Sequence, residues 1–188
     1  MTDVVVFAEE PSGRVIAECL AQKLGIADRT ICIQHSGVKD LERSIRVKTQ
    51  AWGRRPRFLI MRDNDGADCL ARKRHLRSLI LPNVATRVKV RIVMQELESW
   101  YFGDMDAVVR AGFIDIRAAE KKLRKMLGKD PDTIVHVKEN FKRHIVEAGQ
   151  MELAQGIGPQ LSLESNRSRS FHAFVDALRW AADLTREP

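Results

Sequence analysis

The chain has 188 residues, of which 44% are hydrophobic and 30% charged, and its formal net charge is +7. This length and composition predict one compact domain with a sizeable core, and the positive charge favours a polyanionic partner. The chain has no apolar run near the ~18 residues that span a bilayer, no signal peptide, and three cysteines without a CxxC pair, so we expect a cytoplasmic protein with reduced thiols and no membrane partner.

The first half of the chain alternates short β-branched runs with segments of helical periodicity. Strands are expected at Val4–Ala8, Thr30–Gln34, Phe58–Met61 and Val88–Met94, and helices at Arg14–Leu24, Asp40–Ala51 and Ala67–Leu81. Gly25 is placed to end the first helix, and Pro82 to stop the third. This order predicts an α/β fold with a four-stranded parallel sheet and helices on both faces.

The second half is expected to be helical. The predicted helices are Glu96–Ala111, Asp115–Leu127, Thr133–Ala148 and Phe171–Leu184, with a loop at Gly156–Pro159. We therefore expect a core at residues 1–100 and a C-terminal helical extension at residues 101–188, packed on that core within one compact domain.

Acidic residues follow three of the predicted strands. They are Glu9 and Glu10 after the first strand, Asp63 and Asp65 after the third, and Glu96 and Glu98 after the fourth. Because the carboxyl ends of parallel strands share one edge, these carboxylates are expected to gather there. Like charges so close repel one another, and a divalent cation removes the repulsion. Hard oxygen donors favour Mg²⁺ or Mn²⁺, so the pattern predicts a metal-dependent phosphate site.

Each acidic element has a structural alternative. The Asp63–Gly66 segment is also a good turn sequence, although its spacing excludes an EF-hand loop. Glu9 and Glu10 could open the first helix as acids favoured by the helix dipole, and the Glu96–Glu98 segment could open the next helix in the same way. Asp68 is better placed to cap the third helix than to bind metal.

Basic residues are concentrated around Asp63–Gly66, the turn predicted to bind metal. Residues 39–91 contain 15 Lys or Arg and only 5 Asp or Glu. Lys39, Arg62, Arg72 and Lys73 are candidates for neutralising phosphates, and the alternative for each is an ordinary solvated cation. Near the C-terminus, Ser168 and Ser170 are candidates for contact with substrate phosphate, and they could equally serve as caps of the last helix.

Four motifs resemble a known family. They are Ala8–Glu10, the Arg-Asp-x-Asp-Gly turn Arg62–Gly66, the Glu-Leu-Glu-x-Trp segment Glu96–Trp100, and the Asn-x-Ser-x-Ser-Phe stretch Asn166–Phe171. A glutamate after the first strand and a DxD after the third resemble the Toprim domain. The chain is most similar to small stand-alone bacterial Toprim-like proteins of unassigned function, related to the Toprim domain of overcoming-lysogenization-defect (OLD) nucleases.

The resemblance implies a Mg²⁺- or Mn²⁺-dependent phosphodiesterase acting on DNA or RNA. By this similarity, Glu9, Asp63, Asp65 and Glu96 are the expected catalytic residues, and Glu98 joins the first three as an expected metal ligand. The resemblance is compatible with an ATPase partner protein, a homodimer, and a role in phage defence or DNA repair. The chain departs from the Toprim pattern at Glu10, where glycine is usual, and at Ser12–Gly13, where a second acid is expected.

Two other functions compete with this hypothesis. A non-catalytic nucleic-acid-binding or regulatory subunit could use the same fold, and the chain has no Walker A sequence of its own. Haloacid-dehalogenase-like phosphatases also carry a DxD, but theirs follows the first strand and ends in threonine. Here the motif follows the third predicted strand and ends in Gly66, so a phosphatase of that type is disfavoured.

Overall fold

The computed structural model describes residues 2–52, 56–115, 117, 121 and 128–184. Its strands are β1 (Val4–Ala8), β2 (Thr30–Gln34), β3 (Arg57–Asp63) and β4 (Val88–Val93). Its α-helices are α1 (Pro11–Lys23), α2 (Val38–Ala51), α3 (Cys69–Ser78), α4 (Glu98–Gly103), α5 (Met105–Arg110), α7 (Val137–His144), α8 (Gln150–Ile157) and α9 (Arg169–Ala181). Short 3-10 helices are η1 (Ala27–Arg29), η2 (Pro82–Arg87), η3 (Pro131–Thr133) and η4 (Gly158–Gln160).

The four strands form one parallel sheet in the order β2-β1-β3-β4. The central strand β1 is fully buried along its length, as expected for a β-branched strand covered on both faces. This confirms the predicted four-stranded parallel sheet. The register pairs Ala8 with Met61 and Asp63 with Val93, so β1, β3 and β4 end at nearly the same level.

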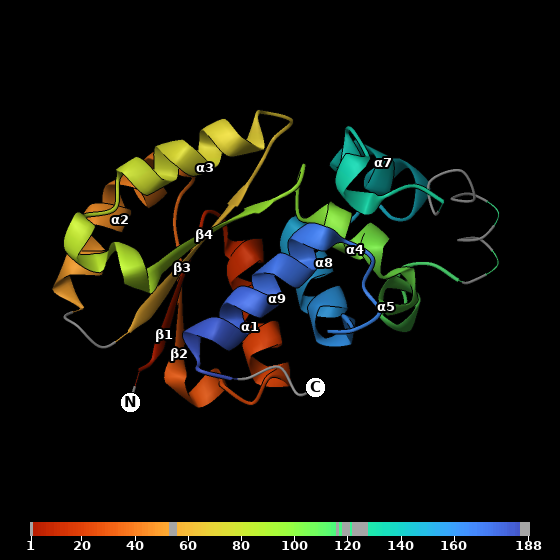
Figure 1. Cartoon of the computed structure of the whole chain (residues 1–188). Coiled ribbons are helices and arrows are strands. Elements are labelled where there is room, and N and C mark those ends of the chain that lie inside the picture. Colours follow the sequence, from red (N-terminus) through yellow and green to blue (C-terminus); the bar gives the residue numbers. More distant parts are fainter. Residues whose placement is uncertain (1, 53–55, 116, 118–120, 122–127, 185–188) are drawn as a thin grey trace.

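Helices cover both faces of the sheet, as Figure 1 shows. On one face, α2 and α3 pack on a cluster that includes Phe7, Phe58 and Ile60. On the other face, α1 and α9 pack on a larger cluster that contains Val6 and Leu59. Alternate residues of each strand therefore enter two separate cores.

The C-terminal helices share the core of the α/β half. Trp100, Phe141 and Phe174 lie in the same cluster as the strand residues and α1, and all three are fully buried. Helix α9 packs directly on β3 and β4, and α8 packs on α1. The predicted domain boundary near residue 100 stays a prediction. None of the helices within the described ranges is both long and apolar enough to cross a membrane.

Several element boundaries differ from the sequence-based prediction. The expected helix at residues 96–111 is divided into α4 and α5, because the side chain of Asp104 accepts a hydrogen bond from Ala107 N and starts a new helix. The expected helix at residues 133–148 is shortened to Val137–His144, because His136 has a left-handed backbone with φ of 50°. The expected helix at 115–127 lies largely outside the described residues.

The predicted loop at Gly156–Pro159 was wrong, since these residues belong to α8 and η4. Their glycines permit close packing instead of a turn. A Cβ on Gly156 would lie 2.7 Å from Phe113, and one on Gly158 would lie 2.9 Å from Ile16. A larger residue at either position would therefore force a neighbouring side chain to shift.

Gly103→Ala is expected to destabilise the fold by about 1–3 kcal/mol. A methyl group there would overlap Asn166 Oδ1 and would lie 3.1 Å from the backbone nitrogen of Ser168. Urea unfolding measures the effect. The matched control is Gly149→Ala, where the new Cβ meets no atom of the described residues within 4 Å. Equal unfolding free energies for the two variants would contradict this explanation.

Candidate functional site

The carboxyl ends of β1, β3 and β4 bring the predicted acidic residues to one edge of the sheet. Glu9 and Glu10 directly follow β1, and Asp63 is the last residue of β3. Glu96 and Glu98 come after β4, and Glu98 is the first residue of α4. The shared edge expected from a parallel sheet is therefore what the chain forms.

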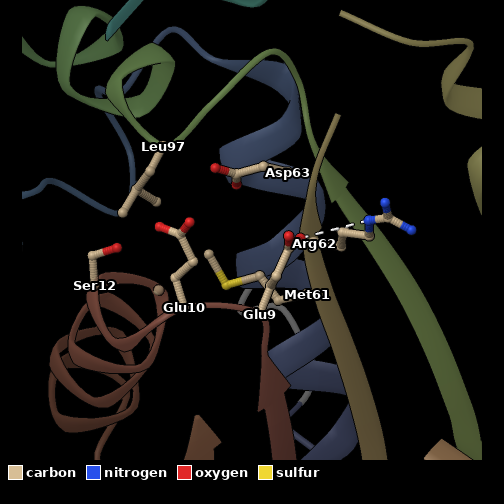
Figure 2. Close-up of a pocket in the computed structure, with 8 residues that line it drawn as sticks. Glu9, Glu10, Ser12, Met61, Arg62, Asp63 and Leu97 are labelled. Carbon is tan, nitrogen blue, oxygen red and sulfur yellow. Dashed lines mark ion pairs between the residues drawn. The ribbon is translucent and has the colours of Figure 1, made fainter. Parts of the chain in front are cut away.

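The two faces of the sheet divide these side chains. Met61 belongs to the core beneath α1 and α9, and Asp63 continues on that face, whereas Arg62 reaches Glu42 of α2 on the other face. Figure 2 shows the carboxylates of Glu10 and Asp63 pointing into the same space, while Glu9 lies beside Arg62. The site thus has an inner acidic part on the α1 side and an arginine-bound part on the α2 side.

A small cavity lies between these groups. Its volume is about 10 Å³, and it is lined by Glu9, Glu10, Ser12, Gly13, Met61, Arg62, Asp63 and Leu97. A space of this size holds about one water molecule or one small ion. Gly13 lines it on the helix side, and a Cβ there would make only ordinary van der Waals contact, 3.5 Å from both Ala8 and Met61.

The carboxyl groups of this site raise one another's pKa values. The pKa of Asp63 lies well above its usual range, first because the group is removed from water and then because Glu98 and Glu9 lie near it. The pKa of Glu98, which is 3% exposed, is raised to about 7, mainly by burial. Both groups thus resist ionisation unless a positive charge is added nearby.

Glu9 is held by Arg62. The Arg62 Nε lies 3.5 Å from Glu9 Oε2, and its Nη1 donates to Glu42 Oε1 at 3.2 Å. His75 Nε2 approaches the same Glu42 oxygen at 3.0 Å. Burial raises the pKa of Glu9, and the guanidinium of Arg62 opposes this rise. Arg62, predicted to contact phosphate, is therefore 7% exposed and engaged by two carboxylates.

Asp65, in the turn predicted to bind metal, has a left-handed backbone with φ of 47°. Arg72 fixes the turn, because its Nε donates to Asn64 O at 2.9 Å and its Nη2 lies 3.4 Å from Asp65 Oδ2. Asp68 caps α3 by accepting from Leu70 N and Ala71 N, which is the capping alternative foreseen for it. Arg72 thus stabilises the turn, and half of the Asp65 side chain stays exposed to solvent.

The donor set can be compared with the needs of a divalent metal. Within the described ranges, no three Asp, Glu, His or Cys side chains already form a group that could hold a metal ion. The chemistry of the donors nevertheless suits Mg²⁺ or Mn²⁺, since all are carboxylates. Glu98 Oε2 is buried and has no hydrogen-bond partner in the described part of the chain, whereas the buried Glu9 Oε2 has the Arg62 guanidinium 3.5 Å away. An unpaired buried acceptor such as Glu98 Oε2 fits a site completed by a cation.

The remaining predicted residues are distributed around this edge. Glu96 Oε1 lies 3.9 Å from Lys138 Nζ of α7, and burial raises the pKa of Glu96. Lys39 is exposed in the first turn of α2. Just before this helix, Gly37 N donates to the carbonyl oxygen of Glu9, the residue after β1, at 3.2 Å. Lys73 of α3 is half-buried, and burial and the nearby Arg91 lower its pKa. The sequence favoured Glu96 over Glu98 as the acid that joins the site. In the structure, Glu98 has the stronger effect on the pKa of Asp63.

Ser168 and Ser170 belong to a buried polar network. Asp132 Oδ1 accepts from Ser168 Oγ at 2.6 Å and from Ser170 Oγ at 3.0 Å, and its Oδ2 accepts from Ser170 N at 2.8 Å. Ser168 also caps α9 through Phe171 N. The capping alternative is thus what the structure contains for Ser168, and both hydroxyls are occupied by structural hydrogen bonds.

The same network fixes the helix that carries Glu98. Trp100 Nε1 donates to Ser170 Oγ at 2.9 Å, and Asn166 Nδ2 donates to Trp100 O at 2.9 Å. Two of the sequence motifs, Glu96–Trp100 and Asn166–Phe171, are therefore joined by direct hydrogen bonds. The sequence analysis missed Asp132 as the centre of this network, because Asp130–Thr133 has the composition of an ordinary turn.

Glu98→Gln is expected to flatten the pH dependence of stability. The folded pKa of Glu98 is about 7 and its unfolded value is 4.5, so the folded protein binds the extra proton and wild-type stability falls as pH rises through this window. At pH 8 the variant should be more stable than wild type by on the order of 3 kcal/mol. Urea unfolding at a series of pH values measures this. The exposed Glu152→Gln is the control, and parallel wild-type and Glu98→Gln curves would contradict the assignment.

Comparisons with known proteins agree with this fold. The C-terminal region of the Burkholderia pseudomallei OLD protein is similar with a TM-score of 0.61 and 16% identity, over 97% of this chain and 98% of that one. The C-terminal region of the Xanthomonas campestris pv. campestris OLD protein is similar with a TM-score of 0.56 and 16% identity, over 98% of this chain and 97% of that one. No curated protein matches the sequence.

These structural similarities confirm the Toprim-like fold expected from the motifs. The sequence itself matches one family over nearly its whole length. That family is described as a domain of unknown function, DUF4276, and the match covers residues 9–179. The chain therefore belongs to the DUF4276 family and has the fold of the C-terminal region of OLD proteins.

Proposed function

We propose that this protein is a Mg²⁺- or Mn²⁺-dependent phosphodiesterase that cleaves nucleic acid at the carboxyl edge of its sheet. The observation that carries the proposal is the crowding of Asp63, Glu98, Glu9 and Glu10, whose burial and mutual repulsion raise the pKa of Asp63. Such crowding is costly without a cation. The fold shared with the C-terminal regions of OLD proteins supports the same chemistry.

Asp63 and Asp65 are the proposed principal metal ligands, with Glu9 and Glu98 as further donors from the two faces. When bound there, a divalent ion supplies stabilisation of negative charge on the phosphate and a more acidic water. Arg62 orients Glu9 through their ion pair, and Arg72 holds Asp65 in place. Glu96, on the solvent side of the edge, is a candidate proton acceptor for the attacking water.

A polyanionic substrate is supported by a group of cations on α3, the helix that follows the Asp63–Gly66 turn, and on β4, the strand next to β3. Burial lowers the pKa of Lys73 on α3, and the nearby Arg91 of β4 and Arg77 of α3 lower it further. Arg91 Nε donates to Ala173 O at 2.8 Å, which fixes its guanidinium near α9. Mutual repulsion among cations is relieved when phosphates bind between them. An ATPase partner and a homodimeric state remain predictions.

Asp63→Asn should abolish Mn²⁺-dependent cleavage of single-stranded DNA or plasmid. The amide removes the negative charge from the residue on which the other carboxylates converge. Gel analysis of cleaved substrate measures the loss, expected to exceed about 100-fold. The control is Asp28→Asn, an exposed aspartate of η1 next to the amino end of β2. Binding without turnover by the wild-type protein would instead favour a non-catalytic nucleic-acid-binding subunit.

Lys73→Gln should weaken binding of single-stranded DNA and reduce the slope of log affinity against log salt by about one. The loss is expected because Lys73 lies with Arg77 and Arg91 in the cationic group. Fluorescence anisotropy at several salt concentrations gives the slope. Lys23→Gln, at the exposed end of α1, is the matched control and should leave it unchanged. An unchanged slope in Lys73→Gln would exclude α3 from the phosphate path.

A further inference from the structure

A second and larger cavity adjoins the proposed metal site. Its volume is about 380 Å³, within the range of small-ligand sites. Three segments line it: the turn at Asp65 and Gly66 after β3, the turn at Gln95 and Glu96 after β4, and residues Val135, His136 and Glu139 at the start of α7. Asp65 therefore belongs to the turn proposed to bind metal, Asp63–Gly66, and also lines this cavity.

The cavity is bounded by backbone that is held in an uncommon conformation. Outside glycine, positive φ occurs in four of the described residues, and three of them line the cavity: Asp65 at 47°, Gln95 at 63° and His136 at 50°. Gln95 O accepts from Asp65 N at 2.9 Å and from Asn64 N at 3.1 Å, so the two turns are locked together. Backbone strain of this kind persists where surrounding structure enforces it and is concentrated at functional sites.

The loop before α7 is fixed to its own helix. Asn140 Nδ2 donates to Val135 O at 3.0 Å, and Asn140 N donates to His136 O at 2.9 Å. The Val135 side chain is 63% exposed, one of the most exposed large hydrophobic side chains among the described residues. An apolar side chain and an imidazole ring are thus presented beside the cavity on a rigid support.

The chemistry of the lining selects a class of ligand. Asp65, Glu96 and Glu139 are acceptors that repel phosphate, Gln95 can both donate and accept, and Val135 and His136 offer an apolar or planar surface. A planar heterocycle whose edge carries amino groups satisfies all of these. Among the parts of a nucleic acid, this is a nucleobase such as cytosine, whose amino group pairs with carboxylates.

We propose that this cavity binds an unpaired, amino-bearing nucleobase next to the metal site proposed at Asp63 and Asp65, where the scissile phosphate would lie. This inference rests on the proposed function, because Asp65 links the base to the scissile phosphate. A base in a duplex has its amino edge already engaged, so the cavity accepts only single-stranded or extruded nucleotides. The protein is thereby assigned a preference for unpaired strands with cytosine, adenine or guanine at this position.

Two single-stranded oligonucleotides of equal length test the proposal, one of deoxycytidine and one of abasic sugar phosphates. Binding is measured by fluorescence anisotropy with Ca²⁺ in place of Mn²⁺. Wild-type protein should prefer oligo-deoxycytidine by at least about fivefold. The double variant Gln95→Asn/Val135→Ala should lose that preference while keeping its affinity for the abasic strand. Asparagine at 95 tolerates the positive φ, so folding is retained.

The matched control is Val47→Ala on α2, because Val47 is 62% exposed and Val135 is 63% exposed. The control should keep the preference of the wild-type protein. Equal wild-type binding of the two strands, or an unchanged preference in the double variant, would overturn the base-binding proposal. Mn²⁺-dependent cleavage in the same preparation would then show that the proposed function stands without it.

A second measurement keeps the inference testable if no nucleic acid is cleaved or bound. Cytidine and uridine are titrated into the isotopically labelled full chain, and backbone amide shifts are followed by NMR. Cytidine should shift the amides of Gln95 and His136 more than uridine does, with no phosphate present. Failure of cleavage together with this shift would reject only the nuclease. An absence of any shift would reject the cavity as a base site.

Discussion

The main physical constraint on this site is the electrostatic repulsion among several carboxylates at one edge of a parallel sheet. Register alone brings them there, because β1 and β3 end side by side and Asp63 is level with the end of β4. Arg62 offsets part of this repulsion for Glu9, but the strongest charged neighbour of Asp63 is Glu98, and that of Glu98 is Glu96, which Lys138 opposes only in part. A divalent cation is the simplest group that would satisfy both.

The C-terminal helices explain how such a costly arrangement is held in place. Asp132 anchors Ser168 and Ser170, and Ser170 in turn fixes Trp100, two residues after Glu98. This network is fully internal, and removing one member would leave buried polar atoms unpaired. The helical half is therefore more than an appendage, because it fixes one of the site's carboxylates and supplies one wall of the second cavity.

Much of the fold could be predicted from local sequence patterns. All four strands and the helices α1, α2 and α3 follow from β-branched runs, helical periodicity and punctuation such as Gly25 and Asp68. The acidic edge also follows, since it needs only strand order and direction. The strands and helices depend on residues that are near one another in the chain, and the acidic edge then follows because parallel strands share one carboxyl edge.

The missed features depend on contacts between distant segments. The engagement of Arg62 by Glu42 needs the packing of α2 on β3, and no local pattern contains it. The burial of Asp132 is visible only once α9 is in place. The cavity beside Asp65 needs the left-handed backbone of His136, a residue that carries no turn signal in the sequence. Sequence thus located the acidic groups but not their partners.

The central claim is that carboxylates from separate strands share one divalent cation. Anomalous scattering from a crystal soaked in Mn²⁺ tests it most directly, because it locates the ion without reference to activity. The account predicts a peak at the carboxyl edge, within coordination distance of Asp63 and Asp65 and next to Glu9 or Glu98. A fully occupied peak elsewhere, or none at this edge under saturating Mn²⁺, would contradict it.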